Sequence, residues 1–175
     1  FICASLPFGG VPHSHDNRYR SKSSTLKNNY VTYVKWNVVF SDEWSNHLEA
    51  ADVLINLCGK SVNCRYTKKN KAAILNSRLT TTRALGEAIG QLKHPPAIWI
   101  NASSATIYRH ATDRPQDEFN GEIANDFSVQ VCKQWEAAFF NFKLPHTRQV
   151  ALRMAITLGQ GSVMTPYLNL VRFGL

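Results

Sequence analysis

Three short segments of this 175-residue chain combine residue types that could bring the backbone close to a ligand. They are residues 57–60, 101–104 and 157–159, and each follows an apolar run. Small side chains at such positions let the main chain approach a bound molecule closely. Ordinary tight turns have a similar composition, so the pattern predicts either one ligand-binding edge or three plain connections.

Residues that can transfer protons lie just beyond the second segment. His110 stands two positions after Tyr108 and could exchange a proton with a substrate, although loop histidines commonly have no such role. Asp113, Asp117 and Glu118 could form a catalytic carboxylate pair. The polar sequence around them favours a solvated acidic loop instead.

The sequence predicts no metal site and no membrane segment. His13 and His15 have the spacing of a metal-binding pair, but nothing nearby completes a site. The four cysteines form no C-x-x-C pair, which favours free thiols in a reducing cytoplasm. No apolar run approaches the roughly 20 residues that span a bilayer. We therefore expect a cytoplasmic protein.

The formal net charge of +8 is unevenly distributed. Residues 60–83 contain seven Lys and Arg residues and no Asp or Glu. Such a stretch suits a phosphorylated small molecule or a polyanion, and it also fits a solvated helix face. Nucleic-acid binding is a weaker alternative, because Tyr66 is the one aromatic residue among these charges.

The elements that must position these residues alternate between buried strands and amphipathic helices. Three apolar runs predict buried strands: residues 52–57, 97–101 and 149–156. Thr67 and Asp126 can cap helices that run to about residues 92 and 142, and a further helix begins near residue 163. This order predicts an α/β fold with an open parallel sheet and right-handed crossovers. Ligands bind such sheets at the carboxyl ends of the strands.

The amino-terminal part of the chain is less regular. Residues 1–29 show no periodicity and predict an irregular or disordered segment. Residues 30–36 alternate as a strand does, and residues 44–50 predict a short helix. We therefore expect an irregular segment over 1–29 and one domain over 30–175.

Five motifs carry a resemblance to a known family. They are ADVLINLCGKSVNCRY, NSRLTTTRALGEAI, WINASSATIY, FSVQVCKQWEAAF and ALRMAITLG, in this order. Together they resemble the epimerase-like, atypical branch of the short-chain dehydrogenase/reductases, whose relatives include nucleotide-sugar epimerases. The resemblance covers roughly residues 31–175. It implies a Rossmann-like fold with helices on both faces of the sheet, and a bound NAD or NADP.

The resemblance also implies roles for individual residues. Ser104 matches the catalytic serine of the extended epimerases, and Tyr108 matches a tyrosine beside the substrate. The implied reaction is redox or epimerisation at a hydroxyl-bearing carbon of a sugar-nucleotide-like substrate. The residues implied to border the cofactor are Leu57, Cys58 and Gly59 at the adenosine half, Asn101, Ala102 and Ser103 near the nicotinamide ribose, and Thr157 and Leu158 near the carboxamide.

Two features of the family are missing from the sequence. The glycine-rich G-x-x-G-x-x-G turn, which binds the pyrophosphate through backbone N–H groups, is absent. We therefore expect a fold that is incomplete at its amino-terminal end and weak or absent cofactor binding. Since the chain begins with Phe1 and stops at Leu175 within a predicted helix, we expect it to be an excerpt of a longer protein or a shortened product.

The catalytic Tyr-x-x-x-Lys motif is the second missing feature. Ser128 and Cys132 stand at roughly its two positions, and Lys133 lies about 100° away around the helix. A non-catalytic dinucleotide-binding or interaction module is therefore an alternative to an active epimerase or dehydrogenase. The substrate, the choice between NAD and NADP, and the oligomeric state stay open.

Overall fold

The structure is a computed structural model, and it describes residues 34, 36, 38, 42–156 and 164–174. The predicted segment 1–29 and most of the predicted strand 30–36 lie outside the described residues, so the predicted domain boundary stays a prediction. The elements follow in the order α1 (Asp42–Ser45), η1 (Asn46–Leu48), β1 (Val53–Asn56), α2 (Lys68–Ile89), β2 (Ile98–Ser104), η2 (Ala105–Ile107), α3 (Phe127–Phe140), β3 (Arg148–Met154) and α4 (Met164–Arg172).

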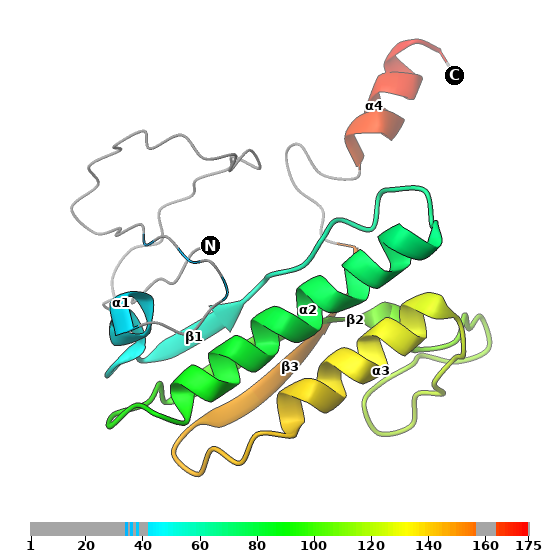
Figure 1. The fold of residues 1–175 in the computed structure, drawn as a ribbon. Helices are drawn as coiled ribbons and strands as arrows, with labels where there is room; N and C mark the ends of the chain where they lie inside the picture. Colours follow the sequence, from blue (N-terminus) through cyan, green and yellow to red (C-terminus); the bar gives the residue numbers. More distant parts are fainter. Residues whose placement is uncertain (1–33, 35, 37, 39–41, 157–163, 175) are drawn as a thin grey trace.

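The three strands form one parallel sheet in the order β1-β2-β3. In the register of this sheet, Asn56 of β1 lies opposite Asn101 of β2, which in turn lies opposite Ala151 of β3. Helices connect the strands in sequence (Figure 1), as parallel pairing requires. The predicted α/β fold with adjacent parallel strands is confirmed.

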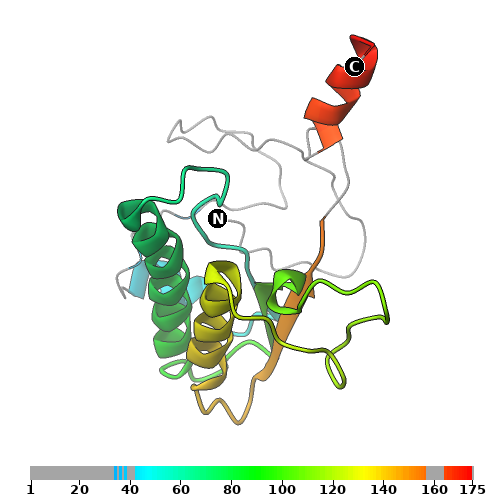
Figure 2. The same ribbon diagram turned by 90° about the vertical axis from the view of Figure 1, so that its right-hand side faces the viewer.

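Helices α2 and α3 lie side by side over one face of the sheet (Figures 1 and 2). Both connections move in the same direction across the sheet, and right-handed crossovers then place both helices on the same side. Between the helices and the sheet lies an apolar core in which Trp99 packs edge-on against Phe139 at 4.6 Å between ring centroids. The second helical layer that the resemblance implies is therefore not formed by the described residues.

The opposite face of the sheet is apolar and open. Ile55, Leu152 and Met154 alternate with the residues that face the core, and each is about two fifths exposed (41%, 42% and 41%). Alternation of this kind is the geometry of a strand, in which successive side chains point to opposite faces. The described part of the sheet thus offers a second apolar surface.

Both predicted helix caps are present. The Thr67 side chain accepts a hydrogen bond from the Asn70 amide, and the Asp126 side chain accepts one from the Val129 amide. Helix α2 ends at Ile89, slightly before the predicted end, while β2 continues to Ser104, beyond its predicted end. The extra residues of β2 pair in register with the end of β3, so a backbone partner decides this boundary rather than side-chain composition.

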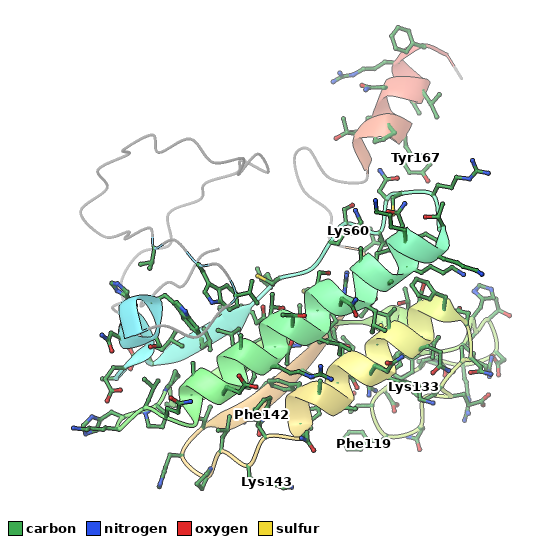
Figure 3. All side chains as sticks on the ribbon, in the orientation of Figure 1. Lys60, Phe119, Lys133, Phe142, Lys143 and Tyr167 are labelled. Carbon is green, nitrogen blue, oxygen red and sulfur yellow. The ribbon has the colours of Figure 1, made fainter. Side chains whose placement is uncertain are left out.

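A close contact joins α2 and α3. At Gly86 a Cβ atom would collide with the ring of Phe142, which lies just after α3 (Figure 3). A glycine at this point therefore lets the aromatic ring pack against the backbone of α2.

Helix α4 stands apart from the sheet in both ribbon views (Figures 1 and 2). Its larger apolar side chains are exposed, including Tyr167, Leu168 and Val171. Among the described helices, none combines the length and the apolar character that crossing a membrane requires.

Candidate functional site

A buried polar network lies at the carboxyl end of β1 and the middle of β2. Asn56 Nδ2 donates to Asn101 Oδ1 at 2.6 Å and to Thr82 Oγ1 at 3.3 Å. Trp135 Nε1 donates to the same threonine oxygen at 2.8 Å. Asn56 Oδ1 accepts the amide of Cys58 at 3.0 Å, so the network fixes the turn by which the chain leaves β1.

The loop after β1 is also tied to helix α2. The Lys60 amide donates to Ser77 Oγ at 2.9 Å, and Arg78 Nη1 donates to the Lys60 carbonyl at 3.1 Å. Figure 3 shows Lys60 on the loop that connects β1 to α2. At Gly59 a Cβ atom would lie 2.9 Å from Arg78 Cζ, so the absent side chain leaves room for the guanidinium.

Two residues predicted to border the adenosine half differ in their surroundings. Leu57 is 67% exposed at the edge of the sheet. Cys58 is half-buried, and burial raises the pKa of its thiol to about 11. The thiol is therefore neutral at physiological pH, which suits packing rather than nucleophilic chemistry.

The residues predicted to lie near the nicotinamide ribose have buried side chains. Asn101 belongs to the polar network, and Ala102 is buried. The Ser103 hydroxyl donates to Glu136 Oε1 at 2.6 Å, on the side of the sheet covered by α3. Thr157 and Leu158 lie outside the described residues.

Ser104 and Tyr108 flank the short helix η2. The Ser104 Oγ atom accepts hydrogen bonds from the Thr106 amide at 3.2 Å and from the Thr106 hydroxyl at 2.9 Å, so it caps η2. Tyr108 follows η2 and is half-buried, and its hydroxyl accepts a hydrogen bond from Arg153 Nη1 at 2.7 Å. The Arg153 guanidinium also lies over the tyrosine ring, 5.2 Å from its centroid.

A cavity of about 840 Å³ opens beside Tyr108. Arg153 and Glu136 form part of its wall, together with residues of the loop after η2. Exposed His110 is also in the wall, whereas Ser104 is not among the described lining residues. The structure thus places one of the two predicted catalytic residues at a cavity, next to a cation.

The cation is held in place by a carboxylate that the sequence analysis missed. Arg153 Nε and Nη2 donate to the two oxygens of Glu136 at 2.9 and 2.8 Å. Burial raises the pKa of Glu136, but hydrogen bonds from Arg153 and Ser103 outweigh it, so the net pKa is lowered. The signal in the sequence was that Glu136 is the one acidic residue of FSVQVCKQWEAAF and Arg153 the one charged residue of ALRMAITLG.

Helix α3 supplies no lysine to the cluster formed by Tyr108, Arg153 and Glu136. Cys132 is buried, with its Sγ atom 3.9 Å from Thr106 Oγ1. Lys133 is exposed on the outer side of the helix (Figure 3). Among the described residues, the cation that binds the Tyr108 hydroxyl comes from β3 instead.

The acidic loop carries structural contacts. Asp113 forms an ion pair with Arg109 at 2.8 Å, and Asp117 Oδ1 accepts the amides of Phe119 and Asn120 at 2.9 and 2.6 Å. These carboxylates shape the loop that borders the cavity.

Comparisons with known proteins identify relatives of this fold. No family model matches the chain. An epimerase family protein of Staphylococcus saprophyticus is 33% identical over 140 residues, which are 80% of this chain and 46% of that protein. The human epimerase family protein SDR39U1 (isoform 2), whose crystal structure is with NADPH, is 32% identical with a TM-score of 0.65 over 73% of this chain and 44% of that one.

A nucleoside-diphosphate sugar epimerase from Corynebacterium glutamicum is more distant, at 26% identity and a TM-score of 0.59, over 81% of this chain and 29% of its own. The chain therefore spans less than half the length of these relatives. Sequence similarity over most of the chain and a shared parallel α/β sheet lead to one conclusion: this chain belongs to the epimerase family.

Proposed function

We propose that this chain is part of an NAD(P)-binding protein that acts on a hydroxyl-bearing carbon of a sugar-nucleotide-like substrate. The observation that carries the proposal is the Tyr108 hydroxyl, which lies in the wall of a cavity 2.7 Å from the Arg153 guanidinium. The relatives support the same direction, since one is a structure with NADPH and another is named a nucleoside-diphosphate sugar epimerase.

The residues at the strand ends fit a dinucleotide chemically. Leu57 and Ile156 are 67% and 73% exposed just beyond β1 and β3, and they offer apolar surface to flat rings. The basic loop at Gly59 suits phosphate groups. Leu57, Cys58 and Gly59 would then border the adenosine half. A bound nicotinamide would supply hydride transfer.

The remaining residues implied by the resemblance would border the nicotinamide half of the cofactor. The backbone of Asn101, Ala102 and Ser103 would lie near the nicotinamide ribose, because two of these side chains are engaged inside the protein. Thr157 and Leu158 would lie near the carboxamide.

Tyr108 would exchange a proton with the substrate hydroxyl. Arg153 donates a hydrogen bond to the phenol oxygen, which is the atom that would carry negative charge after proton loss. Glu136 fixes the Arg153 guanidinium through two hydrogen bonds. Ser104 would orient the substrate hydroxyl, as the resemblance implies.

A second candidate is a non-catalytic module that binds a dinucleotide. The observation that favours it is the buried Cys132, which stands near the place of the lysine in Tyr-x-x-x-Lys. We keep the proposed cytoplasmic location for either candidate, because it rests on the cysteine pattern of the sequence.

Two measurements separate the candidates. The first is calorimetric titration of the chain with NADPH and NADH up to millimolar concentration, for which we expect weak binding because the glycine-rich turn is absent. The second is turnover of a panel of nucleotide sugars, in the presence of the cofactor, by a full-length form that contains the glycine-rich turn. In a form that contains the glycine-rich turn, binding with turnover supports the enzyme and binding without turnover supports the module. No binding of either dinucleotide by that form contradicts both.

A further inference from the structure

Arg78 lies between α2 and α3 at the point where the chain leaves β1. Its Nη1 atom donates to the carbonyls of Lys60 at 3.1 Å and Ile74 at 3.0 Å. Its Cζ atom lies 5.1 Å from the centroid of the Trp135 ring. The guanidinium therefore has a fixed position, with one side on an aromatic ring and the other against the Gly59 backbone.

The positive charge of this side chain has no partner of opposite charge in the described part of the chain. Arg78 is half-buried and forms none of the ion pairs found among the described residues. Burial lowers the pKa of Arg78. Its sequence neighbours add further positive charge, since residues 60–83 contain no acid. Removing a cation from water without a counter-ion costs free energy, which an anion at this position would offset.

Three of the five N–H donors of Arg78 remain available in the described structure. The two carbonyl contacts use Nη1, whereas Nε and Nη2 donate to no described residue. A guanidinium presents such donors as a planar fork that matches the oxygens of a phosphate group. The contacts that hold the Lys60 loop do not use the edge of the guanidinium formed by Nε and Nη2.

We infer that Arg78 binds a phosphate group of the dinucleotide at the carboxyl end of β1. The inference rests on the proposed function and adds to it a residue that anchors the anionic part of the cofactor. Gly59 contributes by making room for the guanidinium beside its backbone, and Trp135 supports the guanidinium from α3.

The test measures binding of inorganic pyrophosphate, NADPH, NADH and adenosine to four variants and the wild-type chain. Arg78→Met removes the charge, Arg78→Lys keeps the charge without the fork, and Gly59→Ala keeps the arginine but displaces its guanidinium. Arg83→Met is the matched control, because Arg83 is exposed on the same helix and its loss changes the net charge equally. Ligand-observed NMR detects millimolar affinities, and melting curves show whether each variant is folded.

We expect Arg78→Met to weaken pyrophosphate and dinucleotide binding about 10- to 100-fold, from the loss of charge-assisted hydrogen bonds. The affinities of Arg78→Lys and Gly59→Ala should lie between those of the wild type and Arg78→Met. Arg83→Met should change the affinity less than about twofold, because exposed charges are screened by salt. Adenosine binding should not change in any variant. A larger loss for NADPH than for NADH would assign the contact to the 2′-phosphate, and an equal loss to the pyrophosphate. Equal effects of Arg78→Met and Arg83→Met would overturn the inference.

The outcomes also separate the inference from the proposed function. Binding of pyrophosphate that depends on Arg78, without binding of either dinucleotide, would support the anion site and contradict the proposed function. If NADPH binds and its affinity is unchanged in the folded Arg78 and Gly59 variants, the result would support the proposed function and contradict the anion site at Arg78. Absence of binding of every phosphorylated probe to the wild-type chain would overturn both.

Discussion

Arg153 Nη1 lies 2.7 Å from the hydroxyl oxygen of Tyr108, although the two residues are 45 positions apart in the sequence. The same guanidinium binds both oxygens of Glu136. One side chain of β3 therefore links the segment after η2 to helix α3, and it does so at the wall of the cavity.

Replacing Tyr108 with phenylalanine tests the proposed acid/base. The ring remains and only the hydroxyl is lost, so turnover by an active form should fall about 100-fold or more, while cofactor affinity stays nearly unchanged. Steady-state kinetics and calorimetry measure the two effects. Tyr66→Phe is the matched control, because no described residue binds the Tyr66 hydroxyl and the residue is 43% exposed. Unchanged turnover in Tyr108→Phe would favour the non-catalytic module.

Glu136 should make the stability of the fold depend on pH. Its pKa is lowered in the folded state, so its stabilising effect is complete above the unfolded pKa of about 4.3 and is lost as pH falls through the lower folded value. Glu136→Gln should therefore destabilise the chain more at pH 7 than at pH 3. Urea unfolding at both pH values measures this difference. An equal loss at both would show that the carboxylate charge is not what stabilises the cluster.

Gly121 should be required for the position of Tyr108. A Cβ atom at this residue would collide with the Tyr108 ring and with the Asp117 carbonyl. Gly121→Ala should cost about 1–3 kcal/mol of unfolding free energy, the usual range for overpacking. Gly90→Ala is the control, since its Cβ would meet its nearest neighbour at an ordinary 3.5 Å. Chemical denaturation of both variants should show a loss only in the first.

The Cys58 thiol should react slowly with alkylating agents. With a pKa of about 11, its reactive thiolate fraction is about one in a thousand at pH 8. The alkylation rate by iodoacetamide should rise about tenfold for each pH unit from 8 to 10 and should increase on unfolding, as the pKa returns to about 8.5. Mass spectrometry of the peptide containing Cys58 follows the reaction. A fast reaction at pH 8 in the folded chain would contradict the buried environment of this thiol.

Much of the fold followed from local sequence patterns, and the contacts of the site did not. Apolar runs and capping residues correctly predicted the strands, their parallel order and the starts of α2 and α3. Apolar composition does not decide burial along α2, since Leu75 and Leu79 are only half-buried while Thr82 is fully buried. Periodicity identifies apolar residues but cannot show that a threonine will meet two asparagines and a tryptophan inside the core.

The pairing of Glu136 with Arg153 was invisible for the same reason. Glu136 is the one acidic residue of its motif and Arg153 the one charged residue of ALRMAITLG, and a helix end and a loop separate the two motifs. A pattern within one element gives no information about the partner that another element will bring. The sequence also does not distinguish Arg78 from the other six basic residues of 60–83. Its contacts with Lys60 and Trp135, on which the proposed phosphate binding rests, are visible only in the structure.

The pairing of Asn56 with Asn101 has a consequence for how the strands find their alignment. The two residues are opposite each other in the register of β1 and β2, and both are fully buried. A slip by one residue would set Asn56 against Ile100 or Ala102 and leave amide groups unpaired, at about 1–3 kcal/mol for each. Apolar side chains alone would tolerate many alignments, whereas this pair accepts one. Substitutions at positions 56 and 101 should therefore be energetically coupled, and a change at either position should be tolerated only together with a compensating change at the other.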